Sequence, residues 1–570
     1  MASRGSSHGQ SSDFALHRMR GRWFSLYAAF LIMAGSGTMY LFGIYSTEIA
    51  LSLGYDQSEL RYLTFYKDFG ANFAVMNGLF AEIAPSWLLL LLSAGMNFWA
   101  YFMIWLAVTQ RVARPELWQM CFYIFIGANA PNFSGTRAIV TSVRNFPESR
   151  GVVLGLLKSY IGLSGPIFMQ IHHALGGNDL KSLILFIAWF PAVINLVLMF
   201  AFREKKFVRQ PQEMRVFYHY LYVSIAMAMF VMAFTIIQKH VEFSQVGYAG
   251  CAMVVFVMLF VLPLLISIRE EHFDWTINNS YNKTNIENVP RAIQIQPKVN
   301  GYEHGNSSEM SSFFDKIFNK PGRGEDHTIL QAILSMDMMY LFITTACGIG
   351  TGLTAINNLE RIGEALGYPS RTIQAFSSLL NIWNYVGRVF SGFVSEYLLR
   401  KYKIPRPVML TFMLALSSVG YILIAFPFNG SIYVACVIIG FSFGSQLPLV
   451  NAIISELFGL KHFSTLFNCG QSASPLGAYL LNAKIVQPNY ERMSDSLIVE
   501  GAGVGNMICS GEVCFKDSFT VLASVAILGG FVSQILMERT KRFYEGDIYK
   551  RFRDPPNNNA EEQTSSSSAR

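Results

Sequence analysis

Two basic side chains are the clearest candidates for chemistry, because both lie within long apolar runs. Arg137 precedes a short polar turn by about two helical turns, and Lys158 follows the same turn by about two. A charge that deep in a bilayer is costly and usually functional. The pair therefore predicts a site for an anion or for a coupled proton. The alternative is a structural charge that reaches the headgroups or pairs with a neighbouring helix.

Uncharged polar side chains accompany this pair on other apolar segments. Such groups turn towards the interior of a helix bundle, where a single amide more often joins helices than binds a ligand. We interpret the whole set as the lining of a substrate cavity, with charges in the first half of the chain and mainly amides in the second. The added members are Tyr40, Asn72, Asn132, Asn384, Gln446 and Gln471.

These residues imply helices that cross a membrane, and the composition agrees. Of 570 residues, 52% are hydrophobic and 14% are charged, whereas an average soluble chain has about 25% charged residues. Apolar runs of about 20 residues recur, and each is long enough to cross a bilayer. The sequence thus predicts an all-α membrane protein with fourteen spans. They are expected at 23–46, 61–82, 86–109, 117–140, 151–172, 181–202, 216–238, 246–268, 332–357, 371–398, 407–427, 431–453, 462–484 and 517–538.

Basic residues at the ends of these spans account for the net charge of +7, so the charge indicates orientation rather than a nucleic-acid partner. Lys and Arg gather on the side that holds both termini, and we therefore expect both termini in the cytosol. Residues 1–22 are Ser/Gly-rich and are expected to be disordered, and residues 539–570 form a polar cytosolic tail. No cleavable signal peptide is expected, because the first apolar run is too long.

Short matches indicate an internal duplication. The triplet LGY at 53–55 and GLFAE at 78–82 recur as LGY at 366–368 and GFVSE at 392–396. Their order and spacing predict two six-helix halves, as in many transporters. The predicted units are a first half at 23–202, a basic linker with two inserted helices at 203–268, a cytosolic central loop at 269–325 and a second half at 332–538.

The stretch NYVGRVFSGFVSE at 384–396, followed by Arg400, looks like a signature of the major facilitator superfamily. In that superfamily it joins the second and third helices of a half. The resemblance implies a transporter fold with a cytosolic latch that breaks and re-forms as the halves rock. The first half retains the acidic part of the pattern and lacks the basic part. The implied gating residues are Glu82, Gly387, Arg388, Glu396 and Arg400.

A longer block is more specific. The run from RWFSLYAAF at 22–30 to KSYIGLSGPIF at 158–168 resembles the plant nodulin-like branch of that superfamily, which includes the nuclear-fusion-defective proteins. The resemblance covers about residues 20–270, and the C-terminal half fits it too. The chain is similar, more distantly, to bacterial oxalate/formate antiporters. The branch implies the fold and a plant source, and it implies no particular substrate.

Cys509 and Cys514 lie in the one long loop that we expect outside the cytosol. An oxidising compartment would allow a disulfide between them, and two free thiols are the alternative. The sequence contains no constellation typical of catalysis or of metal binding. We therefore expect neither an enzyme nor a cofactor.

Together these features predict a secondary active transporter that works by alternating access, as a monomer in the plasma membrane or the vacuolar membrane. The intramembrane basic pair favours a small organic or inorganic anion as the substrate. Protons or a counter-transported ion would drive its movement. A non-transporting membrane sensor or scaffold with the same fold is the alternative.

Overall fold

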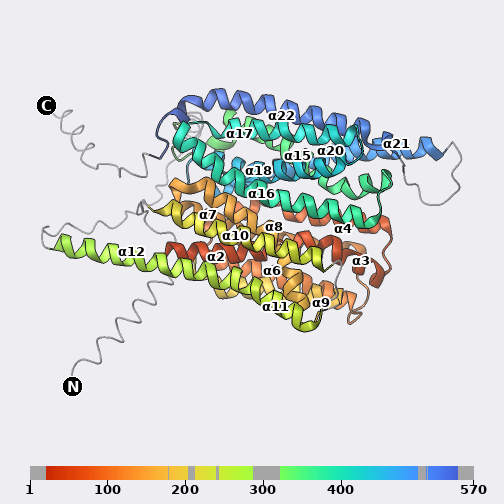
Figure 1. Ribbon diagram of the computed structural model, residues 1–570, viewed down its shortest axis with the longest axis horizontal. Coiled ribbons are helices and arrows are strands. Elements are labelled where there is room, and N and C mark those ends of the chain that lie inside the picture. Colours follow the sequence, from red (N-terminus) through yellow and green to blue (C-terminus); the bar gives the residue numbers. More distant parts are fainter. Residues whose placement is uncertain are drawn as a thin grey trace, which may run out of the picture.

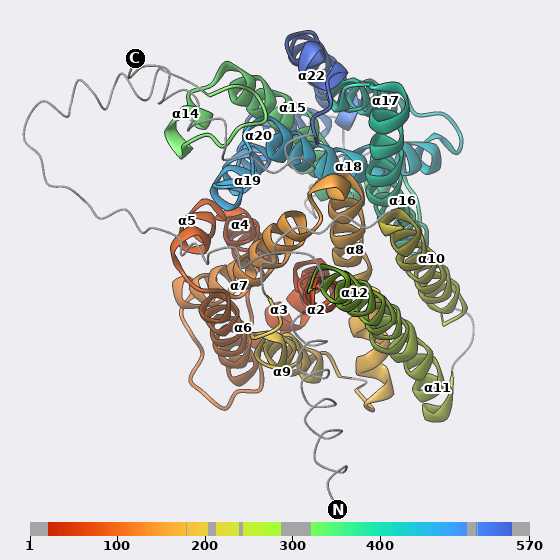
Figure 2. The same ribbon diagram turned by 90° about the vertical axis from the view of Figure 1, so that its left-hand side faces the viewer.

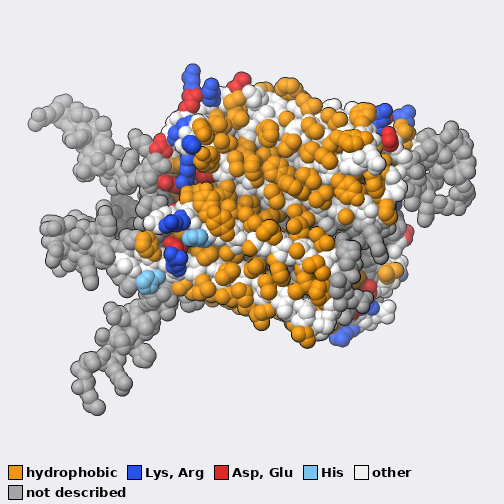
Figure 3. Space-filling view, in the orientation of Figure 1, with side chains coloured by type: hydrophobic (Ala, Val, Ile, Leu, Met, Phe, Trp, Pro, Cys, Tyr) orange, Lys and Arg blue, Asp and Glu red, His pale blue; other side chains and the backbone are white. Residues whose placement is uncertain are grey.

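The computed structural model describes residues 21–177, 179–202, 212–238, 243–286, 321–498, 509 and 511–549. The elements of these residues are all helical, and the long helices run side by side along the molecule (Figure 1). On the face shown in Figure 3, hydrophobic side chains cover the middle, and charged side chains gather at the two ends. This distribution is that of a helical membrane protein, because charges are tolerated at low cost only outside the hydrocarbon region.

The first half places helices at all six predicted spans, and two of these spans are interrupted. The first span breaks at Ser36, whose hydroxyl donates to the Ile32 carbonyl oxygen (2.6 Å). The second breaks at Phe73 and Ala74. The elements are α2 (Arg22–Gly35), η1 (Thr38–Leu41), α3 (Phe42–Leu53), α4 (Gln57–Asn72), α5 (Val75–Ile83), α6 (Ser86–Val108), α7 (Leu117–Asn145), η2 (Pro147–Ser149), α8 (Arg150–Ala174) and α9 (Leu180–Leu198).

The second half also has helices at its six predicted spans. The span predicted at 462–484 is divided into α19, α20 and a π-helical turn, η4. The elements are α14 (Ile329–Ile333), α15 (Met336–Ala365), α16 (Ser370–Tyr402), α17 (Arg406–Ala425), α18 (Ser431–Leu457), α19 (Phe463–Gln471), α20 (Ala473–Leu481), η4 (Asn482–Val486), α21 (Gln487–Ile498) and α22 (Val513–Glu545).

The two inserted helices are α10 (Glu213–Ile237) and a longer one made of α11 (Gln245–Phe256), η3 (Val257–Val261) and α12 (Leu262–Ile286). The continuation of α12 to Ile286 corrects the prediction of a loop from residue 269. The apolar pattern ends there, but the helix is stabilised by contact with α2. Glu271 accepts a hydrogen bond from the Trp23 amide (2.6 Å), and Ser267 donates to the Trp23 carbonyl oxygen (3.1 Å). Residues 287–320 of the predicted loop lie outside the described residues, as do residues 1–20 and 550–570.

Nine helices in the described part of the chain are long and apolar enough to cross a membrane. They coincide with nine of the fourteen predicted spans. The other five predicted spans fall on helices that are interrupted or more polar, namely α2 with α3, α4 with α5, α7, α16, and α19 with α20. The total of fourteen therefore stays a prediction.

Asn97 on α6 explains how α9 tolerates Pro191 in its interior. Proline has no N–H, so the carbonyl of Ile187, four residues earlier, loses its helical partner. The Asn97 amide donates to the carbonyl oxygens of Ile187 (2.9 Å) and Ala188 (3.0 Å). The side chain thus satisfies backbone groups that a bilayer would otherwise leave unpaired.

The two halves lie beside each other when viewed from one end, with α10 to α12 along one side (Figure 2). Helices α8 and α16 bring the halves into backbone contact. A β-carbon on Gly155 would lie 2.8 Å from the Arg388 carbonyl oxygen and 2.9 Å from the Gly392 Cα. Only small residues allow helices to approach so closely.

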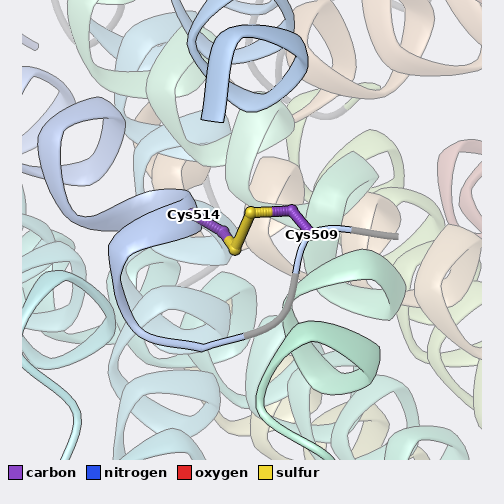
Figure 4. The surroundings of a disulfide bond; sticks show 2 residues. All are labelled: Cys509 and Cys514. Carbon is purple, nitrogen blue, oxygen red and sulfur yellow. A yellow bond between two sulfur atoms is a disulfide. The ribbon is translucent and has the colours of Figure 1, made fainter. Parts of the chain in front are cut away.

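Cys509 and Cys514 are joined by a disulfide beside the start of α22, and their Cα atoms are 6.0 Å apart (Figure 4). The neighbouring α21 lies at the right-hand end of the molecule in Figure 1. We call this the disulfide end.

Asn97→Leu should lower the free energy of unfolding by about 2 kcal/mol, because two carbonyl oxygens lose their donor in an apolar setting. The measurement is the Tm of the detergent-solubilised protein. Asn357→Leu is the matched control, since Asn357 is exposed on α15. Equal Tm values for the two variants would contradict the role assigned to Asn97.

Gly155→Ala should lower the Tm, because the added methyl group meets the backbone of α16. Gly162→Ala on the same helix has nothing within 4 Å of the new atom, and alanine favours a helix over glycine by about 1 kcal/mol. The control should therefore keep or raise the Tm. If Gly155→Ala is as stable as Gly162→Ala, the close contact of α8 with α16 is wrong.

Candidate functional site

Basic side chains reach across one end of the interface between the halves. Arg144 on α7 donates to the carbonyl oxygens of Leu460 (3.0 Å) and Lys461 (2.8 Å), just before α19. Arg150 at the start of α8 donates to the carbonyl oxygen of Ser455 on α18 (2.6 Å). Guanidinium groups of the first half thus hold the ends of helices in the second.

Glu82, at the end of α5, makes a second set of contacts across the same interface. Its carboxylate accepts hydrogen bonds from the hydroxyl groups of Ser464 and Thr465 on α19, the latter at 3.3 Å. His462 Nδ1 lies 3.3 Å from the other carboxylate oxygen. The first half lacks the basic residues of the motif. Glu82 instead contacts Ser464, Thr465 and His462 of the opposite half.

Glu396 lies at the centre of a buried network in the second half. Its carboxylate pairs with Arg400 (3.0 Å) and with Arg406 (2.6 Å), and Arg406 also pairs with Glu456 (2.7 Å). Arg400 extends the network into the first half, where it donates to the Glu148 carbonyl oxygen and to the Ser149 hydroxyl (3.2 Å). Glu396 and Arg400, the predicted latch residues, thus lie together and contact the other half.

Both ends of the described chain join this network. At the N-terminal side, Glu213 lies 3.5 Å from Arg22 and accepts a hydrogen bond from Ser149 (2.6 Å). At the C-terminal side, the Tyr549 hydroxyl lies 3.1 Å from Glu396 Oε1. We therefore call this the terminal end of the molecule.

The phenol of Tyr549 acts as a hydrogen-bond donor in this network. Burial, reinforced by the nearby carboxylates of Glu396 and Glu456, raises the pKa of Tyr549 well above its usual value. The group therefore keeps its proton.

Sequence reasoning missed Arg406, Glu456 and Tyr549 as members of the network. Arg406 and Glu456 lie just outside predicted spans, where charges are ordinary orientation signals. Tyr549 lies in a segment predicted to be a polar tail. The sequence places an acidic or a basic residue at each of these helix ends. It does not show which helix ends lie together in the fold, so it could not predict the ion pairs.

Further inside, Lys158 and Arg388 meet where α8 packs on α16. The Lys158 ammonium lies 5.1 Å from the ring centroid of Phe467, which belongs to the other half. Arg388 donates to the Lys158 carbonyl oxygen and, at 2.9 Å, to Asn384 Oδ1. Both basic side chains are buried. These contacts place Arg388 beside the predicted cavity residues Lys158 and Asn384.

Amide side chains of the first half, including the predicted cavity residues Asn72 and Asn132, bond backbone carbonyl groups. Asn132 donates to the Ala71 carbonyl oxygen (2.8 Å) at the break between α4 and α5, and Asn129 donates to that of Phe73 (2.8 Å). Asn72 donates to the Asp68 carbonyl oxygen of its own helix (2.7 Å). Because these amides already donate to backbone carbonyl oxygens, they stabilise the helices rather than offer free donors to a substrate.

Two further polar pairs involve amides of the second half. Gln471 donates to Asn451 (3.3 Å). Asn468 bonds Thr136, the neighbour of half-buried Arg137, across the halves (3.1 Å). Arg137 is thus next in sequence to a residue that contacts the other half. Lys158 contacts the other half itself, through the ring of Phe467.

The remaining predicted residues have other surroundings. Gln446 is buried, and a β-carbon on Gly348 would lie 2.2 Å from its Oε1, so it faces α15 within the second half. A β-carbon on Gly387 would meet the Phe441 carbonyl oxygen at 2.2 Å, which places Gly387 in the contact of α16 with α18. The side chain of Tyr40 lies outside the described part of the structure.

The interface is thus polar at the terminal end and in the middle. Nearer the disulfide end, an aromatic contact joins α4 and α20, with the rings of Phe65 and Tyr479 6.3 Å apart. An arrangement of this kind fastens the halves at one end by charges and encloses basic side chains farther in.

Comparison with known proteins identifies relatives of the whole chain. Residues 22–268 match the family described as "Nodulin-like", and residues 327–546 match "NFD4, C-terminal domain". Protein NUCLEAR FUSION DEFECTIVE 4 of Arabidopsis thaliana is 24% identical over 545 residues, which cover 93% of this chain and 91% of that protein. Probable transporter MCH1 of Yarrowia lipolytica is 26% identical over 218 residues, which cover 36% of this chain and 42% of that protein.

Solved structures show the same fold. The major facilitator superfamily proton:xylose symporter XylE, bound to 6-bromo-6-deoxy-D-glucose, aligns with a TM-score of 0.50 at 10% identity, covering 91% of this chain and 95% of that chain. The family matches and this shared fold agree with the resemblance seen in the sequence. The two family matches together cover most of the chain, which therefore belongs to the Nodulin-like family, and its fold is that of the solved major facilitator symporter.

Proposed function

We propose that the protein is a secondary active transporter that moves a small organic or inorganic anion by alternating access. Lys158 is the observation that carries this proposal. Its side chain is buried at 8% exposure on the interface of the halves, against the ring of Phe467. Among the described residues, no carboxylate forms an ion pair with it. A buried cation without a counter-charge is unfavourable, and an anion bound between the halves would supply that charge.

Neighbouring groups support an anion more than a neutral solute. Arg388 bonds the backbone of Lys158, and Arg137 follows Thr136, which touches the opposite half. Two basic side chains, Lys158 and Arg388, therefore lie where α8 meets α16. Hydroxyl and amide groups of Thr136, Asn468 and Asn384 would orient the bound anion, as fixed polar groups do in most ligand sites.

The position of the charged contacts supports alternating access. The ion pairs and hydrogen bonds of the terminal end would close the pathway on that side, and their separation would open it. The distribution of Lys and Arg favours a cytosolic location for this end. The described state would then be closed towards the cytosol. The membrane would be the plasma membrane or the vacuolar membrane. A relative named a probable transporter and a structural neighbour named a proton symporter support transport and proton coupling.

The substrate can be sought by adding small carboxylates and inorganic anions, one at a time, to the purified protein. A ligand present at one hundred times its Kd stabilises the fold by about 2.7 kcal/mol. We expect one anion to raise the Tm and to be taken up by liposomes that contain the protein. A panel in which no anion does either would favour the non-transporting sensor or scaffold.

Lys158→Gln should reduce uptake of that anion by at least about tenfold, the effect of losing a charged contact. The same variant should have a Tm at least as high as the unaltered protein, because a buried unpaired charge has been removed. Lys181→Gln is the control, since Lys181 is 38% exposed and lies 3.7 Å from Glu48. Normal uptake by Lys158→Gln would rule out an anion held by Lys158.

A further inference from the structure

The last described residues of the chain fold back across the terminal end. After α22 ends at Glu545, residues 546–549 turn towards the buried network, and Tyr549 enters it at 4% exposure. A tyrosine so close to a polar tail is ordinarily exposed. Its burial here requires an explanation.

The contacts of Tyr549 belong to both halves. Its hydroxyl lies 3.1 Å from Glu396 Oε1 and accepts from Arg406 at 3.3 Å, both in the second half. The guanidinium of Arg150, in the first half, lies over its ring at 5.8 Å from the centroid. Arg150 in turn bonds the Ser455 backbone across the interface. Tyr549 therefore fills the space between groups that must separate when the halves part.

Tyr544 provides an internal comparison. Its hydroxyl also donates to a carboxylate of the network, Glu456, at 2.9 Å, and the side chain is fully buried. Tyr544 lies on α22, so this bond joins two elements of the second half. The two tyrosines make similar bonds, but only Tyr549 bridges the halves.

A hollow lies on one side of the tail. A cavity of about 330 Å³ is bounded by Glu148 of the first half, by Arg400 and Lys403 of the second, and by residues 546–549. The tail therefore lacks close packing on that side, and Tyr549 anchors it to the network. Withdrawal of the tail would leave the ion pairs of Glu396 with Arg400 and Arg406 in place.

We propose that residues 546–549 form a latch in which Tyr549 fastens the two halves in the state closed at the terminal end. Release of the latch lets the halves part and so sets how often the pathway opens on that side. This inference rests on the alternating access proposed above and adds a means of control by the C-terminal segment. Any event that pulls the segment away would favour the open state.

The test measures the separation of the halves directly, without a substrate. Spin labels are placed at Ile83 on α5 and at Tyr402 on α16, both exposed and outside the network, in a protein whose five free cysteines are replaced. Tyr549→Phe should raise the ratio of open to closed molecules by up to about tenfold, because the side chain loses the bond to Glu396 that holds its ring beside Arg150 of the first half. Deletion of residues 546–570 should raise it at least as much.

Tyr544→Phe is the matched control and should leave the distance distribution close to that of the unaltered protein. The latch is refuted if Tyr549→Phe gives the unaltered distribution, or if Tyr544→Phe shifts it equally. Because the readout needs no transported anion, the latch and the anion proposal fail separately. A shift in distance without uptake of any anion would support the latch and overturn the proposed substrate class.

Discussion

The burial of Glu396 with Arg406 is the constraint on which the terminal end depends. Both side chains have 0% exposure, so each has lost its water, and only the opposite charge compensates for that loss. Removing one partner of such a pair costs about 3–5 kcal/mol, more than the intact pair contributes. The network formed by Glu396, Arg406, Arg400 and Glu456 therefore holds or separates as a unit. Arg400 connects this network to the first half by donating a hydrogen bond to the Ser149 hydroxyl.

The middle of the interface differs from the terminal end in how its buried charge is compensated. The terminal end pairs its buried charges, whereas Lys158 faces an aromatic ring. A cation and a ring attract each other less strongly than an ion pair in the same setting. Paired charges thus hold the interface at the terminal end. Farther in, Lys158 forms an ion pair with no carboxylate among the described residues. Under the proposed function, a bound anion would supply the charge that Lys158 lacks, which a permanently paired Lys158 could not accept.

The sequence predicted the helices well and their contacts less well. Long apolar runs show where helices lie, since a bilayer requires about 20 apolar residues for each span. Where α12 passes α2 it is held by the bond between Glu271 and the Trp23 amide, a contact that no local pattern contains. Motif resemblance singled out Glu396 and Arg400, and it could not find Arg406, whose position at a span edge is ordinary. Asn132 was a predicted cavity group, but its amide satisfies the carbonyl of Ala71, a pairing that only the tertiary fold reveals.

Under the proposed function, charged contacts close the pathway between the halves at the terminal end. Thr136 tests it, because it is 3% exposed and bonds Asn468 across the halves. Thr136→Cys, in a background without free cysteines, is exposed to a membrane-impermeant thiol reagent from each side of oriented liposomes. The account predicts faster reaction from the disulfide end, and a gain of reaction from the terminal end when Glu396→Gln is added. Faster reaction from the terminal end in the protein with intact Glu396, or no change on adding Glu396→Gln, would contradict it.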